Sequence, residues 1–431
     1  MCEPMNNPRH NYDVLVIGGG PAGLAAAVCA TQARARVAIV DDNFGPGGQI
    51  WRGEHRQAKS PEAAEWLNRA RVKQVEFIGG ARVYDQPEKG LLLAEMFDGA
   101  LELRYRKLIL ATGARELFLP FPGWTLPNVT GAGGLQALVK SGLPIEGKRV
   151  VVAGSGPLLL AVAAYLLKRG AEVALIAEQA PLKSLLSFGL GLWRAPGKII
   201  QAISLKRELA GVPHIAGCWP VAANGEERLQ RVKLRRGRKT WDVICDYLAC
   251  GFHLAPNVEL AIFLGCEAPD GVVLVDEFQR TTVPDVYCAG EATGIGGLEL
   301  SLVEGQIAGL AATDQWEKAR ALFAKRRKLQ LFADLLNRTF ALRDELKTMP
   351  QPDTIVCRCE DVSFAQLEKQ PAWRAAKLHT RCGMGPCQGR ICGAAIEFLL
   401  GWRPESARPP VFPVKVRSLI QDITPTAGEG K

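Results

Sequence analysis

Five of the twelve cysteines gather near the C-terminal end of this 431-residue sequence. They lie in two short segments, Cys357-Arg-Cys359 and Cys382-Gly-Met-Gly-Pro-Cys387-Gln-Gly-Arg-Ile-Cys392. Thiolates are soft ligands, and four of them suit a two-iron, two-sulfur (2Fe–2S) cluster, with zinc as the rival metal. The clustering favours metal ligands in a reducing compartment over disulfides. Two spacings in the second segment are identical, so spacing does not decide which four cysteines are ligands.

A glycine-rich loop near the N-terminus has the residue types of a pyrophosphate site. It reads Gly18-Gly-Gly20-Pro-Ala-Gly23, and Asp41 follows eighteen residues later. The glycines permit a tight turn, close approach of backbone N–H groups to phosphate, and tight helix packing. Asp41 is placed to accept hydrogen bonds from a ribose. The predicted elements around the loop are a strand over 12–17, a helix over 24–33 and a strand over 36–40.

The next turn, Gly45-Pro-Gly-Gly48-Gln49-Ile-Trp51, favours a flavin as the bound nucleotide. Its glycines can bring the backbone against a flat ring, and the side chain of Gln49 offers an amide partner.

A second glycine loop, Gly154-Ser-Gly156-Pro-Leu-Leu159, follows a predicted strand, and the next strand ends in Glu178. Leu159 stands where the third glycine is expected, which separates helix from strand more than glycine would. This domain therefore either binds a nucleotide in an altered geometry or retains only the fold. Glu178 would favour a free 2′-hydroxyl, so NAD is preferred over its 2′-phosphate form.

Other chemistry is missing from the sequence. No CxxC pair occurs, and residues 47–54 contain no cysteine, which excludes a disulfide reductase. The five histidines are scattered, so no catalytic acid or base is identified.

Composition indicates an ordinary globular protein with two or three domains, at 48% hydrophobic and 23% charged residues. The net charge of +9 is densest at residues 231–239, which predict an exposed hairpin facing solvent or a partner protein, and no nucleic-acid site. The uncharged stretch 150–167 is broken by the second glycine loop, so no transmembrane segment is expected. Without a signal peptide, we expect a cytoplasmic protein.

Two further segments, Leu108-Ile-Leu-Ala-Thr112-Gly113-Ala114 and residues 281–291 with Gly290 and Glu291, complete a resemblance. With the turn at 45–51, they resemble the FAD-domain signatures of two-dinucleotide-domain flavoproteins of the glutathione-reductase type. The resemblance implies an α/β fold with FAD held by residues that include Gly48, Gln49, Thr112, Gly113 and Gly290. Glu291 takes the place of an acid, more usually Asp, that hydrogen-bonds the ribityl chain.

The same resemblance implies a domain order. The expected parts are a discontinuous FAD-binding domain at 11–120 and 250–315, an inserted NAD(P)-type domain at 121–249, a helical linker at 316–352, a 2Fe–2S domain at 353–401 and an extended tail at 402–431.

The cysteine segment is similar to the bacterioferritin-associated ferredoxin-like domain, which holds a 2Fe–2S cluster. The related segment of anaerobic glycerol-3-phosphate dehydrogenase has no cysteine at the place of Cys382. This resemblance implies Cys357, Cys359, Cys387 and Cys392 as the ligands, with Cys382 as a nearby thiol and the alternative fourth ligand.

Almost the whole chain resembles the larger, FAD-binding component of heteromeric amine and imino-acid dehydrogenases. That group includes the alpha subunit of D-hydroxyproline dehydrogenase, the A subunit of opine oxidases and the B subunit of hydrogen cyanide synthase. The residues that carry the resemblance are Pro46-Gly-Gly-Gln-Ile-Trp-Arg52, Gly154-Ser-Gly-Pro-Leu-Leu-Leu160, Gly294-Ile-Gly-Gly-Leu-Glu-Leu300 and Cys357-Arg-Cys-Glu360.

The resemblance implies that a partner flavoprotein of the D-amino-acid-oxidase type oxidises a C–N bond. This chain would relay the electrons to a one-electron acceptor, in some members with FMN at the subunit interface. The alternatives are a self-sufficient NADH-dependent reductase that delivers electrons through the cluster, and a redox sensor or scaffold whose flavin is structural.

Overall fold

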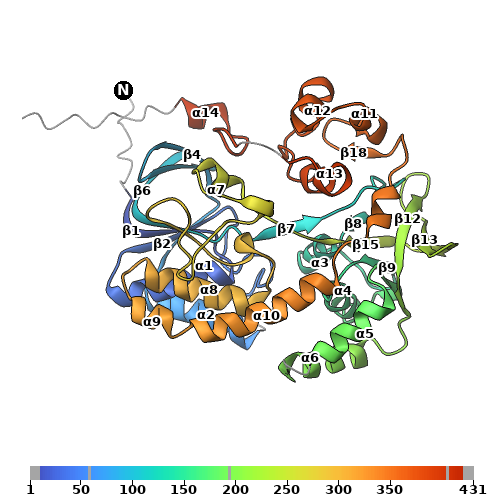
Figure 1. Cartoon of the computed structure of the whole chain (residues 1–431), viewed down its shortest axis with the longest axis horizontal. Coiled ribbons are helices and arrows are strands. Elements are labelled where there is room, and N and C mark those ends of the chain that lie inside the picture. The colour runs from blue at the N-terminus through green and yellow to red at the C-terminus, as the bar shows by residue number, and fades with distance from the viewer. Residues whose placement is uncertain (1–9, 57–59, 193–195, 404–406, 421–431) are drawn as a thin grey trace, which may run out of the picture. The chain divides into compact units, whose positions relative to one another are not determined.

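The computed structural model describes residues 10–56, 60–192, 196–403 and 407–420 (Figure 1). The chain forms two compact units, which are treated separately below. Unit 1 comprises Met1–Gly113, Asn257–Arg326 and Ser406–Lys431, and unit 2 comprises Ala114–Pro256 and Arg327–Glu405. The boundary at 326/327 falls inside helix α10 (Phe323–Thr339).

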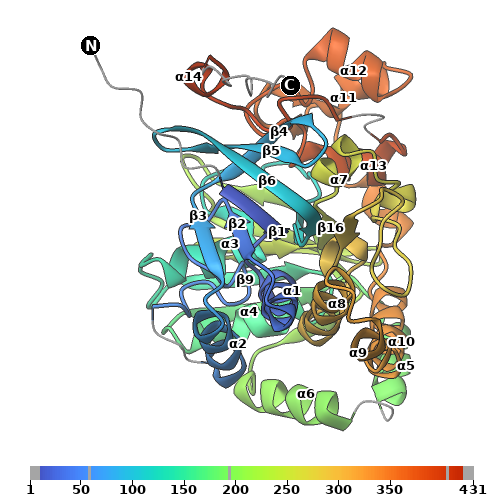
Figure 2. The same cartoon turned by 90° about the vertical axis from the view of Figure 1, so that its left-hand side faces the viewer.

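Unit 1 is built on a seven-stranded sheet in the order β3-β2-β1-β6-β5-β4, with β17 also paired to β6 (Figure 2). Its strands are β1 (His10–Ile17), β2 (Val37–Asp41), β3 (Glu76–Gly79), β4 (Arg82–Glu88), β5 (Leu91–Met96), β6 (Gly99–Leu110) and β17 (Val286–Cys288). Strands β1, β2, β3, β6 and β17 run parallel, while β4 and β5 continue the sheet as an antiparallel meander. The parallel strands are apolar runs because both faces of a parallel sheet are normally covered.

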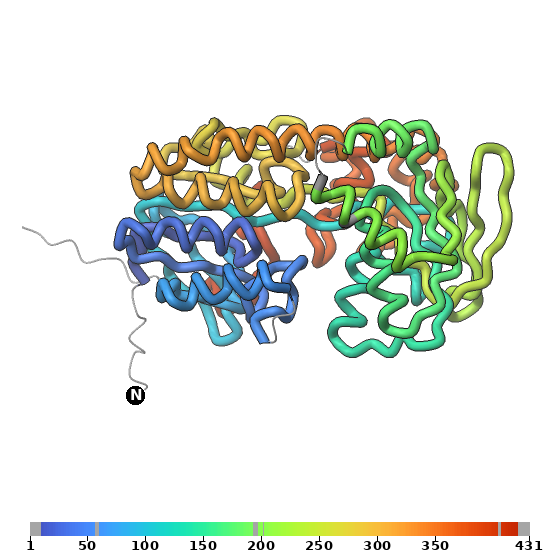
Figure 3. The backbone as a smooth tube through the Cα atoms, turned by 90° about the horizontal axis from the view of Figure 1, so that it is seen from below, coloured from blue at the N-terminus to red at the C-terminus, as the bar shows by residue number. Residues whose placement is uncertain are grey.

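Helices α1 (Pro21–Ala30) and α8 (Leu298–Ala311) pack unusually closely in unit 1, blue beside gold in Figure 3. A Cβ added at Gly305 or Gly309 of α8 would lie 2.1 Å from the carbonyl oxygens of Ala22 or Ala26. Glycine is therefore required at both positions, and the contact fixes α1 against the unit. The other helices of unit 1 are α2 (Pro61–Val72), α7 (Glu259–Phe263), α9 (Trp316–Arg320) and α14 (Val416–Leu419).

Unit 2 is built on a parallel sheet in the order β11-β10-β9-β15-β8. Its strands are β8 (Val129–Gly131), β9 (Arg149–Gly154), β10 (Glu172–Glu178), β11 (His214–Ala216) and β15 (Tyr247–Gly251). The antiparallel sheets are β12 (Cys218–Asn224) with β13 (Arg231–Arg236) and β14 (Lys239–Ile244), β7 (Ala114–Leu117) with β16 (His253–Pro256), and β18 (Ile355–Cys357) with β19 (Val362–Ser363). The helices are α3 (Ala132–Lys140), α4 (Leu158–Leu167), α5 (Leu182–Gly191), α6 (Pro196–Glu208), α11 (Phe364–Glu368), α12 (Trp373–Thr380) and α13 (Cys392–Leu400).

The predicted α/β class is confirmed, with a mixed, mainly parallel sheet in unit 1 and a parallel sheet in unit 2. Each glycine loop joins a strand to a helix, and the basic run at 231–239 lies in the β13–β14 hairpin. The uncharged stretch at 150–167 is strand β9, the loop and helix α4. Among the described residues, no helix has both the length and the apolar character needed to cross a membrane. The domain boundaries proposed from the sequence stay a prediction.

Candidate flavin site and cysteine cluster

The loop between β1 and α1 is tightly packed at its first and third glycines. Gly18 has φ +108°, and a Cβ there would lie 2.2 Å from the carbonyl oxygen of Ala111. A Cβ at Gly23 would lie 1.8 Å from the carbonyl oxygen of Gly18. Neither position can carry a side chain without moving the backbone. The loop is therefore held in one shape by its own glycines.

Gly20, the middle glycine of this loop, is in a different situation. A Cβ there would meet, among described residues, only the Cα of Gly48, at 3.9 Å. Gly20 also has φ −74°, which any residue can adopt. The protein itself therefore does not need glycine here. The open space lies at the N-terminus of α1, where the helix dipole and backbone N–H groups favour a phosphate, so the loop fits a pyrophosphate.

Asp41 ends β2 beside this loop, as predicted. Its buried carboxylate accepts hydrogen bonds from the backbone N–H groups of Gly19, at 2.5 Å, and Asn43, at 2.7 Å. Burial raises the pKa of this carboxyl, while the bonds from Asn43 and Gly19 oppose the rise. The acid is thus fixed against the loop, and its contact with a ribose stays a prediction.

The turn at 45–49 contacts the first loop directly. The N–H of Gly47 donates to the carbonyl oxygen of Gly19 at 2.8 Å. Gly48 has φ +58°, and a Cβ there would approach the Cα of Gly20 to 2.9 Å. Arg52 donates to Oε1 of Gln49 at 2.7 Å, which orients the exposed amide. The structure therefore brings the two predicted glycine segments together.

The turn after β6 is held by Asn257. The hydroxyl of Thr112 donates to the Asn257 carbonyl oxygen at 2.6 Å, and the Asn257 N–H donates to the Gly113 carbonyl oxygen at 2.9 Å. Gly113 has φ +66°. A Cβ added there would have no atom of the described chain within 4 Å. This turn thus presents small residues toward open space.

Gly290 and Glu291 follow β17, and a residue missed by the sequence analysis supports them. Glu304 of α8 is buried, and its carboxylate accepts from the N–H of Gly290 at 3.1 Å. It also forms an ion pair with Arg326 at 3.5 Å. The signal for Glu304 was only a single acid in an otherwise apolar turn of helix. Burial raises the pKa of Glu291, whose carboxylate meets no hydrogen-bond donor among the described residues. This arrangement leaves Glu291 available to a ligand.

Strands β1, β2, β6 and β17 therefore bring the predicted flavin residues to one edge of the sheet in unit 1. Ligands of doubly wound sheets bind outside the carboxyl ends of the strands, which is where these loops lie. The residues present fit FAD, although their individual contacts with it stay predictions.

The second glycine loop lies between β9 and α4 in unit 2. Gly154 has φ +135°, and a Cβ there would lie 2.0 Å from the carbonyl oxygen of Gly251. The carboxylate of Glu178 accepts from the N–H of Gly156 at 2.7 Å and from that of Ala180 at 2.8 Å. Burial raises the pKa of Glu178 to about 7. Leu159, in place of the third glycine, is buried in the core. The structure brings these predicted residues together, and nucleotide binding by them stays a prediction.

The five clustered cysteines also lie in unit 2, in two groups. The sulfur atoms of Cys357, Cys382 and Cys392 all lie within 4.8 Å of one another and are buried. Those of Cys359 and Cys387 are 3.6 Å apart, with Cys359 exposed. The donor chemistry fits a thiolate-ligated metal or cluster. Cys382 and Cys392 are both in the buried group, so this geometry does not choose between them.

Small residues allow the cysteine loops to close. A Cβ at Gly385 would lie 2.3 Å from the Cβ of Cys359. Gly383 and Gly389 pack on the ring of Trp373, where an added Cβ would lie 3.0 or 3.2 Å from the ring. The glycines between the cysteines are thus needed for the chain to fold around one aromatic side chain.

Hydrogen bonds stabilise the thiolate form of Cys357. Bonds from Cys382 and Cys392 lower its pKa to about 2, and the backbone N–H groups of Gly383 and Glu360 act in the same direction. The same contact with Cys357 raises the pKa of Cys382 to about 12. Thiolate is the form that binds metal, and backbone donors to sulfur tune a bound cluster.

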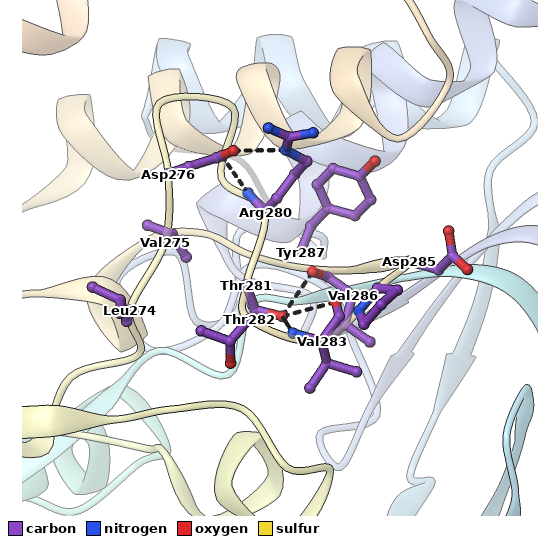
Figure 4. Close-up of a pocket in the computed structure, with 11 residues that line it drawn as sticks. Leu274, Val275, Asp276, Arg280, Thr281, Thr282, Val283, Asp285, Val286 and Tyr287 are labelled. Carbon is purple, nitrogen blue, oxygen red and sulfur yellow. Dashed lines mark hydrogen bonds and ion pairs between the residues drawn. The ribbon is translucent and has the colours of Figure 1, made fainter.

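Unit 1 also contains an open pocket of about 460 Å³, shown in Figure 4. Residues 274–276 and 280–287 line it, and Asp276 there accepts a hydrogen bond from Arg280 at 2.6 Å. None of the predicted site residues lines this pocket, so it adds nothing to the flavin site.

With this geometry established, comparison with known proteins defines the class. The chain belongs to the pyridine nucleotide-disulphide oxidoreductase family, whose sequence pattern it matches over residues 12–313. It is therefore an FAD-dependent oxidoreductase, as the glycine segments predicted.

Two relatives are similar to this chain over most of its length. The chain is 30% identical to the HcnB subunit of hydrogen cyanide synthase from Pseudomonas aeruginosa, over 89% of this chain and 91% of that protein. It is 28% identical to the A subunit of opine oxidase from Agrobacterium tumefaciens, over 96% of this chain and 90% of that protein. The predicted relationship to these two proteins is confirmed.

Solved structures share the fold. L-proline dehydrogenase from P. horikoshii matches with a TM-score of 0.67 and 20% identity, over 96% of this chain and 80% of that chain. Thioredoxin reductase from T. acidophilum matches with a TM-score of 0.56 and 20% identity, over 71% of this chain and 99% of that chain. At such identity, the likeness concerns the fold alone.

Proposed function

We propose that this chain is the electron-transferring component of a heteromeric dehydrogenase that oxidises an amine or imino acid such as D-hydroxyproline, an opine or glycine. A partner of the D-amino-acid-oxidase type carries out the C–N oxidation. The observation that carries the proposal is the presence of five clustered thiols in a chain of flavoprotein fold. Both relatives are also named as subunits of larger enzymes.

The chemistry explains why one chain would hold both groups. Oxidation of a CH–NH bond to C=N releases two electrons and two protons, whereas a 2Fe–2S cluster accepts one electron at a time. Bound FAD supplies the exchange between two-electron and one-electron steps. The residues of this chain bind and orient these groups, and an FMN at the subunit interface would complete the path from the partner.

The proposed FAD contacts are the residues at the edge of the sheet in unit 1: Gly18, Gly20, Gly23, Asp41, Gly48, Gln49, Thr112, Gly113, Gly290 and Glu291. Gly18 and Gly23 fix the loop, and Gly20 admits the pyrophosphate. Asp41 and Glu291 accept hydrogen bonds from the sugar hydroxyls.

The proposed cluster ligands are Cys357, Cys359, Cys387 and Cys392, with Cys382 as the alternative. We expect about two iron and two sulfide per chain. Cys382→Ala should keep the iron, and Cys392→Ala should lose it. The reverse pattern would transfer the ligand role to Cys382, and stoichiometric zinc without sulfide would exclude the iron–sulfur cluster.

Expression of the chain with and without its partner protein tests the relay. D-Hydroxyproline, proline, opines and glycine are assayed with an artificial one-electron acceptor. We expect activity only from the complex, because the described residues include no side chain identified as a catalytic base. Equal rates from the isolated chain would contradict the proposal, and rapid anaerobic bleaching of its flavin by NADH would favour the reductase alternative.

A further inference from the structure

The second glycine loop is covered by a segment distant in sequence. The hydroxyl of Ser155 donates to the carbonyl oxygen of Phe340 at 2.9 Å. Nε2 of Gln179 donates to the carbonyl oxygen of Ala341 at 3.1 Å and to Ser155 Oγ at 2.9 Å. Phe340 and Ala341 follow helix α10 directly, and we call these two residues the strap. The strap thus uses the polar side chains nearest to the loop.

The side chain of Phe340 packs beside the middle glycine. Its Cγ lies 3.9 Å from the position of a Cβ on Gly156. Phe340 is 6% exposed. Its ring packs edge-on against the ring of Phe188, with the two ring centroids 5.4 Å apart. The middle glycine of this motif normally lets the backbone approach a pyrophosphate. Here an aromatic ring of the same chain lies at van der Waals distance from that position.

The backbone donors at this edge of the sheet are also in use. Glu178 accepts from the N–H groups of Gly156 and Ala180. At the start of helix α3, Glu116 accepts from the N–H groups of Gly133, at 2.6 Å, and Gly134, at 3.0 Å. In unit 1 the buried Asp41 holds the N–H of Gly19 in the same way, so this pairing is common to both loops, and the contacts of the strap are what distinguish the second loop.

The strap continues into a segment that is anchored to the same unit. Leu346 and Met349 are buried in a core with Trp219 and Ala395. Farther along, the carbonyl oxygen of Ile355 accepts from Nε1 of Trp124 at 2.6 Å.

A second anchor lies between Cys387 and Cys392, where the carbonyl oxygen of Arg390 accepts from Nε of Arg115 at 2.7 Å. The cysteine segment, residues 353–401, is therefore attached through the strap, near its start at Ile355 and within its second cysteine loop at Arg390.

We propose that the nucleotide loop of unit 2 binds the strap of its own chain, and that this contact mounts the cysteine segment in place of a dinucleotide. This inference deepens the proposed function, since it assigns the second dinucleotide fold the role of a scaffold. It predicts that electrons do not enter through a nicotinamide nucleotide bound there.

The test combines nucleotide titration with amide hydrogen exchange on the isolated flavin-bearing chain. For the wild type, NAD⁺ and NADH should show no saturable binding up to about 1 mM. Peptides covering residues 340–349 should be protected. In Ser155→Ala/Gln179→Ala they should exchange roughly tenfold to hundredfold faster, because two buried hydrogen bonds are removed.

Thr130→Val is the matched control. The buried Thr130 hydroxyl, in the middle of β8, has no hydrogen-bond partner among the described residues, so its removal should not alter the exchange of 340–349. If the double variant does not fold, Ser155→Ala alone should give a smaller increase. Micromolar NAD⁺ or NADH binding, or variants that exchange as the wild type does, would overturn the inference. Failure to find iron would instead count against the proposed function and leave this result unchanged.

Discussion

The two glycine loops of this chain have closely similar sequences and opposite surroundings. In unit 1, an added Cβ at Gly20 meets only a glycine backbone at 3.9 Å, and the carboxylate of Glu291 is free of donors among described residues. In unit 2, Cγ of Phe340 lies 3.9 Å from an added Cβ at Gly156, and the strap carbonyl oxygens accept hydrogen bonds from Ser155 and Gln179. The difference is that polar side chains of the second loop bond to a distant segment of their own chain, whereas no such bond is found at the first loop among the described residues.

This difference shows what a glycine motif does and does not establish. Both loops connect a parallel strand to a helix. A Cβ added at Gly18 would lie 2.2 Å from a neighbouring carbonyl oxygen, and one added at Gly154 would lie 2.0 Å from another. The first glycine therefore serves the fold in each case. We expect ligand binding to depend instead on whether the chain itself uses the polar groups of the loop.

The largest expected effect comes from placing the same side chain in each loop. Gly20→Val should abolish FAD binding, because valine fills space that the protein leaves open for a ligand. Gly156→Val should leave the flavin content unchanged and lower stability by about 1–3 kcal/mol, since φ +99° is strained for valine. Flavin absorbance per chain measures the flavin content of each variant, and the melting temperature measures its stability. Loss of flavin in both variants would contradict the distinction.

The cysteine segment should be separable from the flavin site. Cys357→Ala removes the sulfur that contacts both Cys382 and Cys392, so it should eliminate bound iron and preserve FAD. Cys266→Ala provides the control, since this buried cysteine packs in the core of unit 1. Iron, sulfide and flavin analysis of the purified variants is the measurement. Iron retained by Cys357→Ala at the wild-type level would exclude this sulfur as a ligand.

Glu178 should make the stability of unit 2 fall as the pH rises. Burial raises its pKa to about 7. An unfolded chain has a glutamate pKa near about 4.3, so the folded state binds the proton more tightly. The contribution of Glu178 to the free energy of unfolding is fully present below about pH 4.3. It is lost as pH rises through about 7, and the loss amounts to up to about 3 kcal/mol.

Melting temperatures across this pH range test the effect with a matched pair. Glu178→Gln should flatten this component of the pH profile. Glu172→Gln, at the exposed start of the same strand, should leave the profile as it is. A Glu178→Gln profile parallel to that of the wild type would show that Glu178 ionises normally in the folded protein.

The smallest expected effect concerns the attachment of the cysteine segment. Trp124→Phe removes the N–H that donates to the Ile355 carbonyl oxygen and should destabilise unit 2 by about 1–2 kcal/mol. Trp241, a half-buried residue of strand β14, has no such bond in the described structure, so Trp241→Phe should change the stability less. Differential scanning calorimetry compares the two. Equal effects would mean that the indole N–H contributes nothing to the attachment.

Local sequence patterns predicted the glycine loops and their acids, but not the long-range contacts around them. The glycine loops, Asp41 and Glu178 lie where strand and helix periodicity indicated, because one motif contains all the contacts that define them. Phe340 carries no motif, and its contact with Ser155 spans 185 residues. Glu304 was missed for the same reason, since its partner Gly290 belongs to another element. The clustering of the cysteines was visible, but their division into a buried triad and a pair depends on packing around Trp373.

An inventory of the nucleotides bound to the isolated chain tests the central claim most directly. The chain is purified without its partner, incubated with an excess of NAD⁺, separated from free nucleotide and denatured, and the released nucleotides are quantified by mass spectrometry. The account predicts about one FAD per chain and no NAD⁺, because only the loop of unit 1 is open. A stoichiometric amount of NAD⁺ beside FAD, or a folded chain without flavin, would contradict it.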